Sequence, residues 1–163
     1  MNRFEERTKE YFLKHGFTLN KLSENETKRP DFEDNLQEIL VEIKHYEGEQ
    51  EVDGPDPSFK AIRGHLEKAA RQFQSEDYIQ QKIHIIVFFS EEVLSIDIDS
   101  VLTGCLYPPN RNLLLKSSSH ISKRYIKYID IIAFFEDTKS QKPVKVWCSK
   151  KGKIYLSKNT LFQ

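Results

Sequence analysis

The sequence has few of the features that mark membrane, secreted or metal-stapled proteins. None of its 163 residues belongs to an apolar run of about 18 residues, so no transmembrane helix and no membrane partner are expected. The N-terminal segment MNRFEERTKEYF is charged where a signal peptide would be apolar. These absences predict a chain that stays in the cytoplasm.

Cysteine and histidine are also sparse. Only Cys105 and Cys148 occur, without the spacing of metal ligands, and we expect two buried free thiols rather than a disulfide scaffold. None of the five histidines forms an HxxxH pair, which argues against a zinc site. The length predicts a single domain over residues 1–163 that buries a core without staples.

The net charge is zero at pH 7, but the two signs are separated along the chain. Residues 1–100 hold 13 Lys and Arg against 22 Asp and Glu, a net charge of −9. Residues 101–163 hold 12 Lys and Arg against 3 Asp and Glu, a net charge of +9. A basic segment is typical of a protein that binds a phosphate backbone. The alternative is that the two halves neutralise each other across the fold.

Hydrophobic periodicity predicts an α/β fold with a mixed sheet. The first helix is expected over residues 2–15, with Asn2 as its N-cap and Gly16 as its stop. A second helix, of about 59–75, would begin after Ser58, and a third lies within 97–106. The expected strands are 17–23, 30–34, 38–46, 82–89, 112–116, 128–136, 144–149 and 153–157, with turns at 35–37 and 150–152.

The segment EILVEIKHY, residues 38–46, places two charges in an apolar strand. Alternate residues of a strand share a face, so one face is wholly apolar while Glu42 and Lys44 lie together on the other. The hairpin turn at 35–37 would bring Asp31 close to Glu42. Two close carboxylates raise each other's pKa unless a cation lies between them. Mg²⁺ is commonly held by one or two carboxylates together with a substrate phosphate.

The order of helix, Pro30-Asp31 turn, strand with Glu42-Ile43-Lys44 and following helix resembles the PD-(D/E)XK, or restriction-endonuclease-like, nucleases. The resemblance covers about residues 3–90. It implies α/β/α layers around a central mixed sheet, with extra strands in a basic, β-rich extension over about 107–163. It also implies Mg²⁺ or Mn²⁺ bound by Asp31, Glu42 and the backbone carbonyl of Ile43, with Lys44 assisting the attacking water.

Two further site residues follow from the same resemblance. The pattern E-x-x-A-x-x-Y-L-x-x-x-G of resolvase-like sequences is similar to EERTKEYFLKHG, which places Glu5 at the metal, with Glu6 as the second choice. Gln72, in EKAARQF, stands where some branches carry a catalytic Gln. Each residue also has a plainer interpretation, because Glu5 can serve only the helix dipole and Gln72 can be a surface residue.

The tripeptide E/D-x-K is weak by itself, since it occurs at 26–28, 42–44 and 137–139. Only the middle copy has a Pro-Asp turn before it and a helix after it. The alternative is that Glu42 and Lys44 form a solvated stripe on an edge strand, and that Asp31 only favours its turn.

The segment RNLLLKSSSHISKRYIKY, residues 111–128, contains no acidic residue. Basic residues interleaved with Tyr125 and Tyr128 suit contact with nucleic acid. The alternative is a loop and strand with an ordinary basic edge. The expected nucleic-acid-binding residues are Arg111, Lys116, Lys123, Arg124 and Lys127.

These features together predict a metal-dependent nuclease that hydrolyses phosphodiester bonds through a Mg²⁺-activated water. DNA is the first expected substrate. RNA is the second, because toxin-type members of the resembled superfamily cut tRNA, and a secreted toxin domain therefore stays open beside the cytoplasmic location. The resemblance also allows a homodimer. The alternative function is a non-catalytic module that binds nucleic acid or a protein through residues 111–128.

Overall fold

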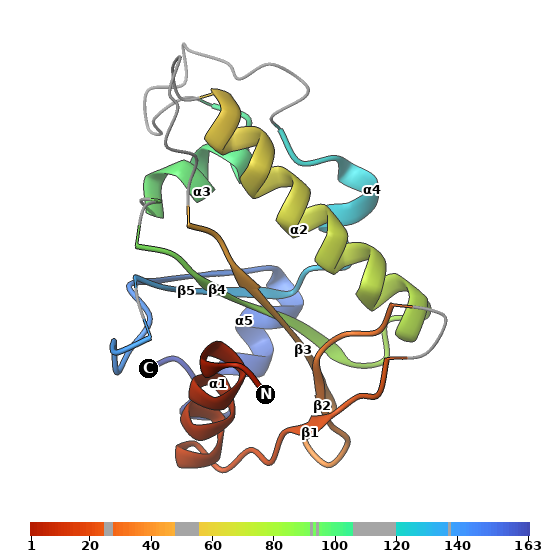
Figure 1. The fold of residues 1–163 in the computed structure, drawn as a ribbon. Helices are drawn as coiled ribbons and strands as arrows, with labels where there is room; N and C mark the ends of the chain where they lie inside the picture. The colour runs from red at the N-terminus through yellow and green to blue at the C-terminus, as the bar shows by residue number, and fades with distance from the viewer. Residues whose placement is uncertain (25–27, 48–55, 92, 94, 106–119, 137) are drawn as a thin grey trace.

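A computed structural model describes the chain except for residues 25–27, 48–55, 92, 94, 106–119 and 137. Its described strands are β1 (Asn20–Lys21), β2 (Phe32–Asp34), β3 (Ile39–His45), β4 (Ile83–Phe89), β5 (Ile131–Phe135) and β6 (Lys145–Cys148). They form one sheet in the order β1-β2-β3-β4-β5-β6 (Figure 1). Neighbouring strands are parallel at β3–β4 and β4–β5 and antiparallel elsewhere, so the expected mixed sheet is confirmed.

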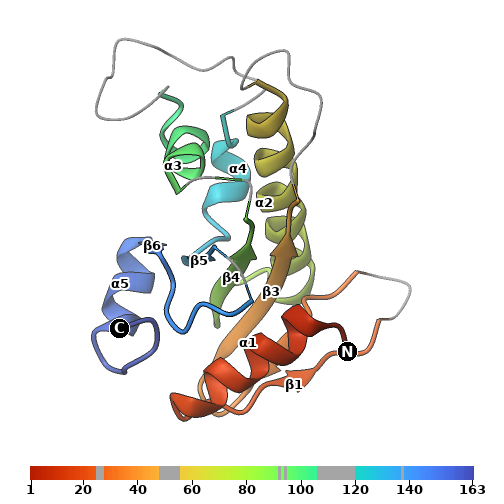
Figure 2. The ribbon, with the colours of Figure 1, turned by 60° about the vertical axis from the view of Figure 1, so that its left-hand side comes forward.

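Helices cover both faces of this sheet, which makes an α/β/α arrangement (Figures 1 and 2). One face packs against α2 (Asp56–Glu76), α3 (Ser95–Thr103) and α4 (Lys123–Ile126). The other face packs against α1 (Arg3–Lys14) and α5 (Lys150–Leu156). A sheet covered on both sides needs apolar residues on both faces of its central strands. All seven residues of β4 are accordingly buried. No helix among the described residues is long and apolar enough to cross a membrane.

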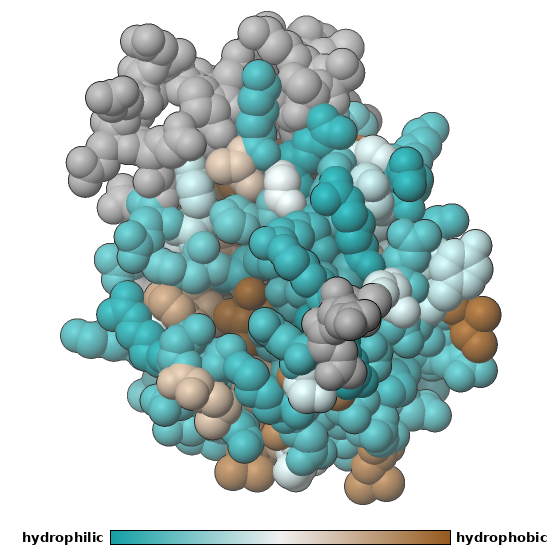
Figure 3. Space-filling model, turned by 45° about the vertical axis from the view of Figure 1, so that its right-hand side comes forward, coloured by the Kyte–Doolittle hydropathy of each residue, from teal (hydrophilic) through white to brown (hydrophobic). Residues whose placement is uncertain are grey.

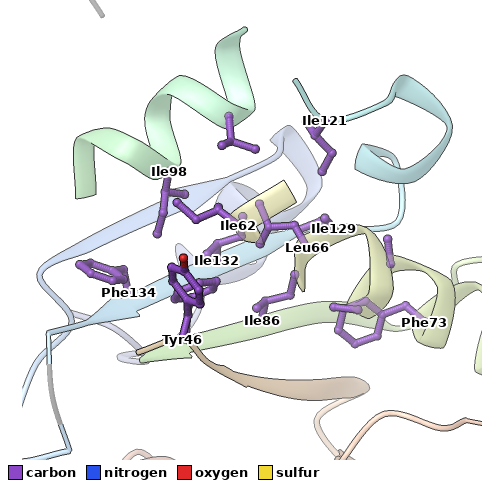
Figure 4. Close-up of a cluster of buried hydrophobic side chains, with 14 of the residues drawn as sticks. Tyr46, Ile62, Leu66, Phe73, Ile86, Ile98, Ile121, Ile129, Ile132 and Phe134 are labelled. Atoms are coloured by element: carbon purple, nitrogen blue, oxygen red, sulfur yellow. The ribbon is translucent and has the colours of Figure 1, made fainter. Parts of the chain in front are cut away.

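The apolar core beneath α2 holds this helix against the sheet. Phe59, Ile62, Leu66 and Phe73 recur at helical spacing and are fully buried. The side chains of Ile62, Leu66 and Phe73 point toward Ile86 and its neighbours on the sheet (Figure 4). Burying one such side chain contributes about 1.5–3 kcal/mol. The helix is therefore held firmly over the strand that carries Glu42 and Lys44.

The N-terminal helix confirms the sequence prediction in detail. Asn2 accepts hydrogen bonds from the backbone N–H groups of Phe4 and Glu5, and the Glu5 carboxylate accepts from the N–H of Asn2 at 3.1 Å. This reciprocal pair is a capping box. Gly16 follows the helix with φ of 85°, a left-handed conformation that glycine adopts at little cost.

Several boundaries differ from the prediction. The strand expected over 17–23 is reduced to Asn20–Lys21, because the alternation of its apolar residues is imperfect. Ser58 lies inside α2, which begins at Asp56, so its expected role as N-cap is wrong. The helix α4 was not predicted. The strand expected at 112–116 lies outside the described residues.

The C-terminal segment contains the clearest error. The strand expected at 153–157 and the turn expected at 150–152 are wrong, because both belong to α5. Ser149 caps this helix by accepting from the N–H of Gly152 at 3.1 Å. Tyr155 and Leu156 then pack against the core on the α1 side of the sheet. Of the expected C-terminal strands, β5 and β6 complete the central sheet itself.

The expectation of two buried thiols is also wrong. Both cysteines are free, as predicted, but Cys105 is half-buried and Cys148 is exposed on β6. The edge position of β6 explains this exposure, since only one neighbouring strand covers it among the described residues.

Candidate active site

The β2–β3 hairpin brings Asp31 next to Glu42. Phe32 pairs with Val41 across the antiparallel strands, so Asp31 lies opposite Glu42 just before the ladder begins. The backbone N–H of Asp31 donates to Oε2 of Glu42 at 3.1 Å. In return, the backbone N–H of Ile43 donates to Oδ2 of Asp31 at 2.8 Å. Ile43 therefore contacts Asp31 through its N–H group, whereas the resemblance implied a role for its carbonyl.

Glu42 and Lys44 lie on a covered strand rather than on an edge. β3 lies between β2 and β4, and Glu42 is 3% exposed and Lys44 8% exposed. The alternative of a solvated stripe on an edge strand is therefore wrong. Lys44 Nζ lies 2.9 Å from Oε1 of Glu42. A buried ion pair of this kind costs desolvation energy, so it is weak evidence for a role in stability alone.

Gln72 reaches the same place from α2. Its Oε1 accepts a hydrogen bond from Lys44 Nζ at 3.3 Å, and its Nε2 donates to the carbonyl of Arg29 at 3.0 Å. Arg29 is held in turn by two hydrogen bonds to Glu76, at 2.9 and 2.6 Å. The interpretation of Gln72 as a surface residue is therefore wrong. Its amide joins the lysine of β3 to the chain segment that precedes β2.

The pKa values of the Asp31 and Glu42 carboxyl groups are both raised. Burial, followed by repulsion from Asp31, raises the pKa of Glu42 to about 7, although Lys44 and Gln72 act to lower it. Burial also raises the pKa of Asp31, against the opposing effect of the Ile43 N–H, and the charge of Glu5 raises it further. Each carboxylate therefore favours the protonated form, first because burial disfavours its charge and then because a neighbouring carboxylate adds to this effect.

Glu5 lies near this pair but is already engaged. Its Oε1 lies 2.6 Å from Lys21 Nζ, and its carboxylate completes the capping box of α1. Burial alone would raise the pKa of Glu5, but the hydrogen bonds from Lys21 and Asn2 outweigh it and lower the pKa. Its electrostatic effect on Asp31 shows that Glu5 belongs to the surroundings of the site. Glu6, the second choice, is exposed on α1.

The part of the chain that the structure describes holds no complete metal-ligand set made of protein side chains. Among the described residues, no group of three or more His, Cys, Asp or Glu side chains is arranged to hold a metal ion. The oxygen donors that do lie together are those of Asp31 and Glu42. Mg²⁺ often takes only one or two carboxylates and completes its shell with water and substrate phosphate. The donor set therefore fits an ion of this type that is shared with a substrate.

The predicted nucleic-acid-binding residues are only partly covered by the structure. Arg111 and Lys116 lie outside the described residues. Lys123, Arg124 and Lys127 are exposed on α4 or directly after it. The alternative of a loop and strand is wrong for Lys123 and Arg124, because residues 123–126 form a helix that contacts α2, whereas Lys127 lies in the turn after this helix.

Two basic residues, Lys68 and Lys28, lie beside the site, and the sequence prediction placed neither among the expected binding residues. Lys68 precedes Gln72 by one helical turn, so both lie on one side of α2. Lys28 precedes Arg29, whose carbonyl is bonded to Gln72. The helical spacing of Lys68 and Gln72 was a readable signal, whereas the position of Lys28 depends on the hairpin. Figure 3 shows that the surface is mainly hydrophilic on the face seen when the right-hand side of Figure 1 is brought forward.

Comparison of the chain with family models, with curated proteins and with solved structures gives no match.

Proposed function

We propose that the protein is a metal-dependent nuclease with a restriction-endonuclease-like fold. The observation that carries this proposal is the pair of half-buried Asp31 and buried Glu42, whose pKa values are both raised while Lys44 lies against Glu42. Strongly perturbed carboxylates with a specific charged partner are typical of functional sites. The sheet order, with β1 at the edge next to the β2–β3 hairpin and with a helix after the E-x-K strand, supports the resemblance to this fold.

The carboxylates of Asp31 and Glu42 are the groups that would hold Mg²⁺ or Mn²⁺. When bound, such an ion lowers the pKa of a water and neutralises charge on a phosphoryl oxygen. A divalent ion also removes the repulsion that raises the pKa of Glu42, so the cost of burying two carboxylates falls when the ion is present. Glu5 adds negative potential beside Asp31 without giving up its bond to Lys21.

Lys44 is the residue placed to act on the water and on developing negative charge. Its ammonium is fixed between Glu42 and Gln72, so it is oriented before a substrate arrives. A fixed positive charge in a site that excludes bulk water stabilises a phosphoryl transition state effectively. Gln72 positions Lys44 and ties it to the segment before β2, and it does not need to touch the substrate for this role.

The proposed substrate is a nucleic acid, DNA first and RNA second. The exposed basic residues on α4 and those beside the site give the acidic catalytic half a surface that attracts a polyanion. Cleavage of DNA and RNA substrates side by side decides the preference between the two.

The test uses the purified full chain with Mg²⁺ or Mn²⁺ and a panel of duplex DNA, branched DNA, single strands and tRNA. Glu42→Gln and Lys44→Ala are each expected to abolish cleavage. Glu33 and Lys82 form a second Lys–Glu pair on the same sheet, at 3.3 Å, and provide matched controls. Glu33→Gln and Lys82→Ala are expected to cleave like the wild type.

The outcome separates the nuclease from a non-catalytic module. Loss of cleavage confined to the Glu42 and Lys44 variants, with unchanged circular dichroism, supports the proposal. If the wild type leaves every nucleic acid intact and binds no Mg²⁺ or Mn²⁺, the proposal is wrong and the same fold serves binding alone. Equal cleavage by all four variants would show that the reaction belongs to another site.

A further inference from the structure

Lys28 and Lys68 each lie near one end of the hydrogen bond that joins Gln72 of α2 to the segment before β2. Gln72 donates to the carbonyl of Arg29, which fixes the segment carrying Lys28 against α2. Lys68 stands one turn before Gln72 on that helix. Both lysines are exposed, in contrast to the buried Lys44.

Neither lysine is neutralised by the part of the protein that the structure describes. No ion pair joins Lys28 or Lys68 to a carboxylate among the described residues, whereas Arg29 and Lys44 each have one. The nearby charges of Lys28 and then Lys44 lower the pKa of Lys68. Like charges that approach without an anion between them raise the free energy of the unbound protein, and an anion relieves this repulsion.

The positive charge continues from Lys68 over the exposed side of α2 to α4. Arg71 follows Lys68 by three residues and its side chain is 59% exposed. The guanidinium groups of Arg71 and Arg124 lie 5.0 and 4.9 Å from the centre of the Tyr125 ring. Arg71 Nε also donates to the Tyr125 hydroxyl at 3.2 Å. A carboxylate oxygen of Glu67 is 3.9 Å from Arg71, a longer contact that leaves most of this guanidinium open to solvent.

We propose that Lys28, Lys68, Arg71 and Arg124, with Tyr125 between the two arginines, form a cationic track that binds the nucleic-acid backbone beside the cleaved bond. The inner end, Lys28 and Lys68, holds the phosphate next to the one at Asp31 and Glu42. The outer end, Arg71 and Arg124, holds the strand where it passes over α2 to α4. Tyr125 holds the two guanidinium groups near its ring through cation–π contacts. This inference rests on the proposed nuclease function and adds the path of its substrate.

The inner end is tested with the double variant Lys28→Gln/Lys68→Gln, and the outer end with Arg71→Gln/Arg124→Gln. The control is Lys9→Gln/Lys14→Gln, because Lys9 and Lys14 are exposed on α1 on the other side of the sheet. Binding of a short fluorescent duplex DNA is measured with Ca²⁺ in place of Mg²⁺ as a function of salt. Each track variant is expected to bind more weakly and to lose about 1.8 from the slope of log K against log salt, about 0.9 for each lost contact. The control is expected to keep the wild-type slope.

Cleavage kinetics with Mg²⁺ complete the test. The track variants are expected to show a raised KM and a nearly unchanged kcat, since the removed charges position the strand and do not touch the reacting atoms. If both track variants match the wild type in affinity, slope and KM while the wild type cleaves, the track is overturned and the nuclease stands. The same holds if the control loses as much slope as the track variants. If the wild type neither binds nor cleaves DNA or RNA, the proposed function fails and the track fails with it.

Discussion

Asp31 and Glu42 are joined by a backbone hydrogen bond although their carboxylates repel each other. The N–H of Asp31 donates to Oε2 of Glu42 at 3.1 Å, so neither residue can move away without breaking the start of the β2–β3 hairpin. The pKa of Glu42 is therefore raised, first by burial and then by repulsion from Asp31, while the two groups stay together. A pair of close carboxylates whose pKa values are raised without a cation is suited to bind one.

Stability of the metal-free protein is expected to fall as pH rises through the neutral range. The pKa of Glu42 is about 7 in the folded protein against an ordinary value of 4.5, so the folded state holds the extra proton between these values. The contribution is fully present below the ordinary value and is lost as pH rises past about 7. It amounts to about 3 kcal/mol at most. Urea titrations across this range measure the free energy of unfolding, and Asp31→Asn should weaken the pH dependence by removing the repulsion.

Mg²⁺ or Mn²⁺ is expected to reverse this loss. The ion binds the deprotonated carboxylates, so the rise in Tm on adding metal should be larger at a pH of about 8 than at a pH of about 5. With metal at about 100 times its Kd, the gain is about 2.7 kcal/mol, or about 5–10 °C in Tm. The double variant Asp31→Asn/Glu42→Gln should show no metal-dependent shift. An equal shift in the wild type and the double variant would place the metal elsewhere.

Gln72→Leu is expected to destabilise the protein and to slow cleavage. The change removes an acceptor from the buried Lys44 ammonium and a donor from the Arg29 carbonyl, and an unsatisfied buried group costs about 1–3 kcal/mol. The free energy of unfolding and kcat are the measurements. Gln74→Leu is the matched control, because Gln74 is half-buried on the same helix and its amide makes no hydrogen bond among the described residues. Equal effects of the two substitutions would contradict the positioning role of Gln72.

Tyr46→Phe is expected to stabilise the protein by about 1 kcal/mol. The Tyr46 hydroxyl is buried and is the one buried side-chain polar atom without a hydrogen-bond partner among the described residues. Removing an unpaired buried hydroxyl removes its desolvation cost. Tyr155→Phe gives the opposite control, because the Tyr155 hydroxyl donates to the carbonyl of Gln37 at 2.8 Å. Thermal unfolding of both variants should therefore shift Tm in opposite directions, and a loss of stability in Tyr46→Phe would refute the prediction.

Local signals in the sequence predict most of the N-terminal half. The Asn2 cap, the strand β3 and the apolar run of β4 each depend on neighbouring residues, and all three are confirmed. The approach of Asp31 to Glu42 was also predictable, because a short hairpin fixes which residues face each other. Contacts between elements that are far apart in the sequence were harder to predict. The bond from Gln72 to the Arg29 carbonyl depends on how α2 crosses the sheet, which periodicity does not specify.

The C-terminal half shows why short segments mislead. KIYLS, residues 153–157, has the β-branched and aromatic composition of a strand, yet it belongs to α5. Two features outside this pentapeptide decide its structure, the Ser149 cap and the apolar surface of the sheet that receives Tyr155 and Leu156. Tertiary packing of this kind overrides local propensity in a helix as short as α5.

Substitution of Gly152 tests this unexpected helix directly. A Cβ atom at Gly152 would lie 2.2 Å from the carbonyl oxygen of Asp130 and 2.9 Å from Cγ1 of Ile131, so α5 can approach the sheet this closely only with glycine there. Gly152→Ala is expected to destabilise the protein by about 3 kcal/mol or more, since both obstacles belong to β5 or the residue before it. Gly64→Ala is the control, because an added Cβ on the exposed side of α2 meets nothing within 4 Å. This control should stabilise by about 0.5–1 kcal/mol, as alanine does in a helix interior. Urea unfolding of the two variants should therefore give changes of opposite sign, and a harmless Gly152→Ala would mean that α5 does not rest on the sheet.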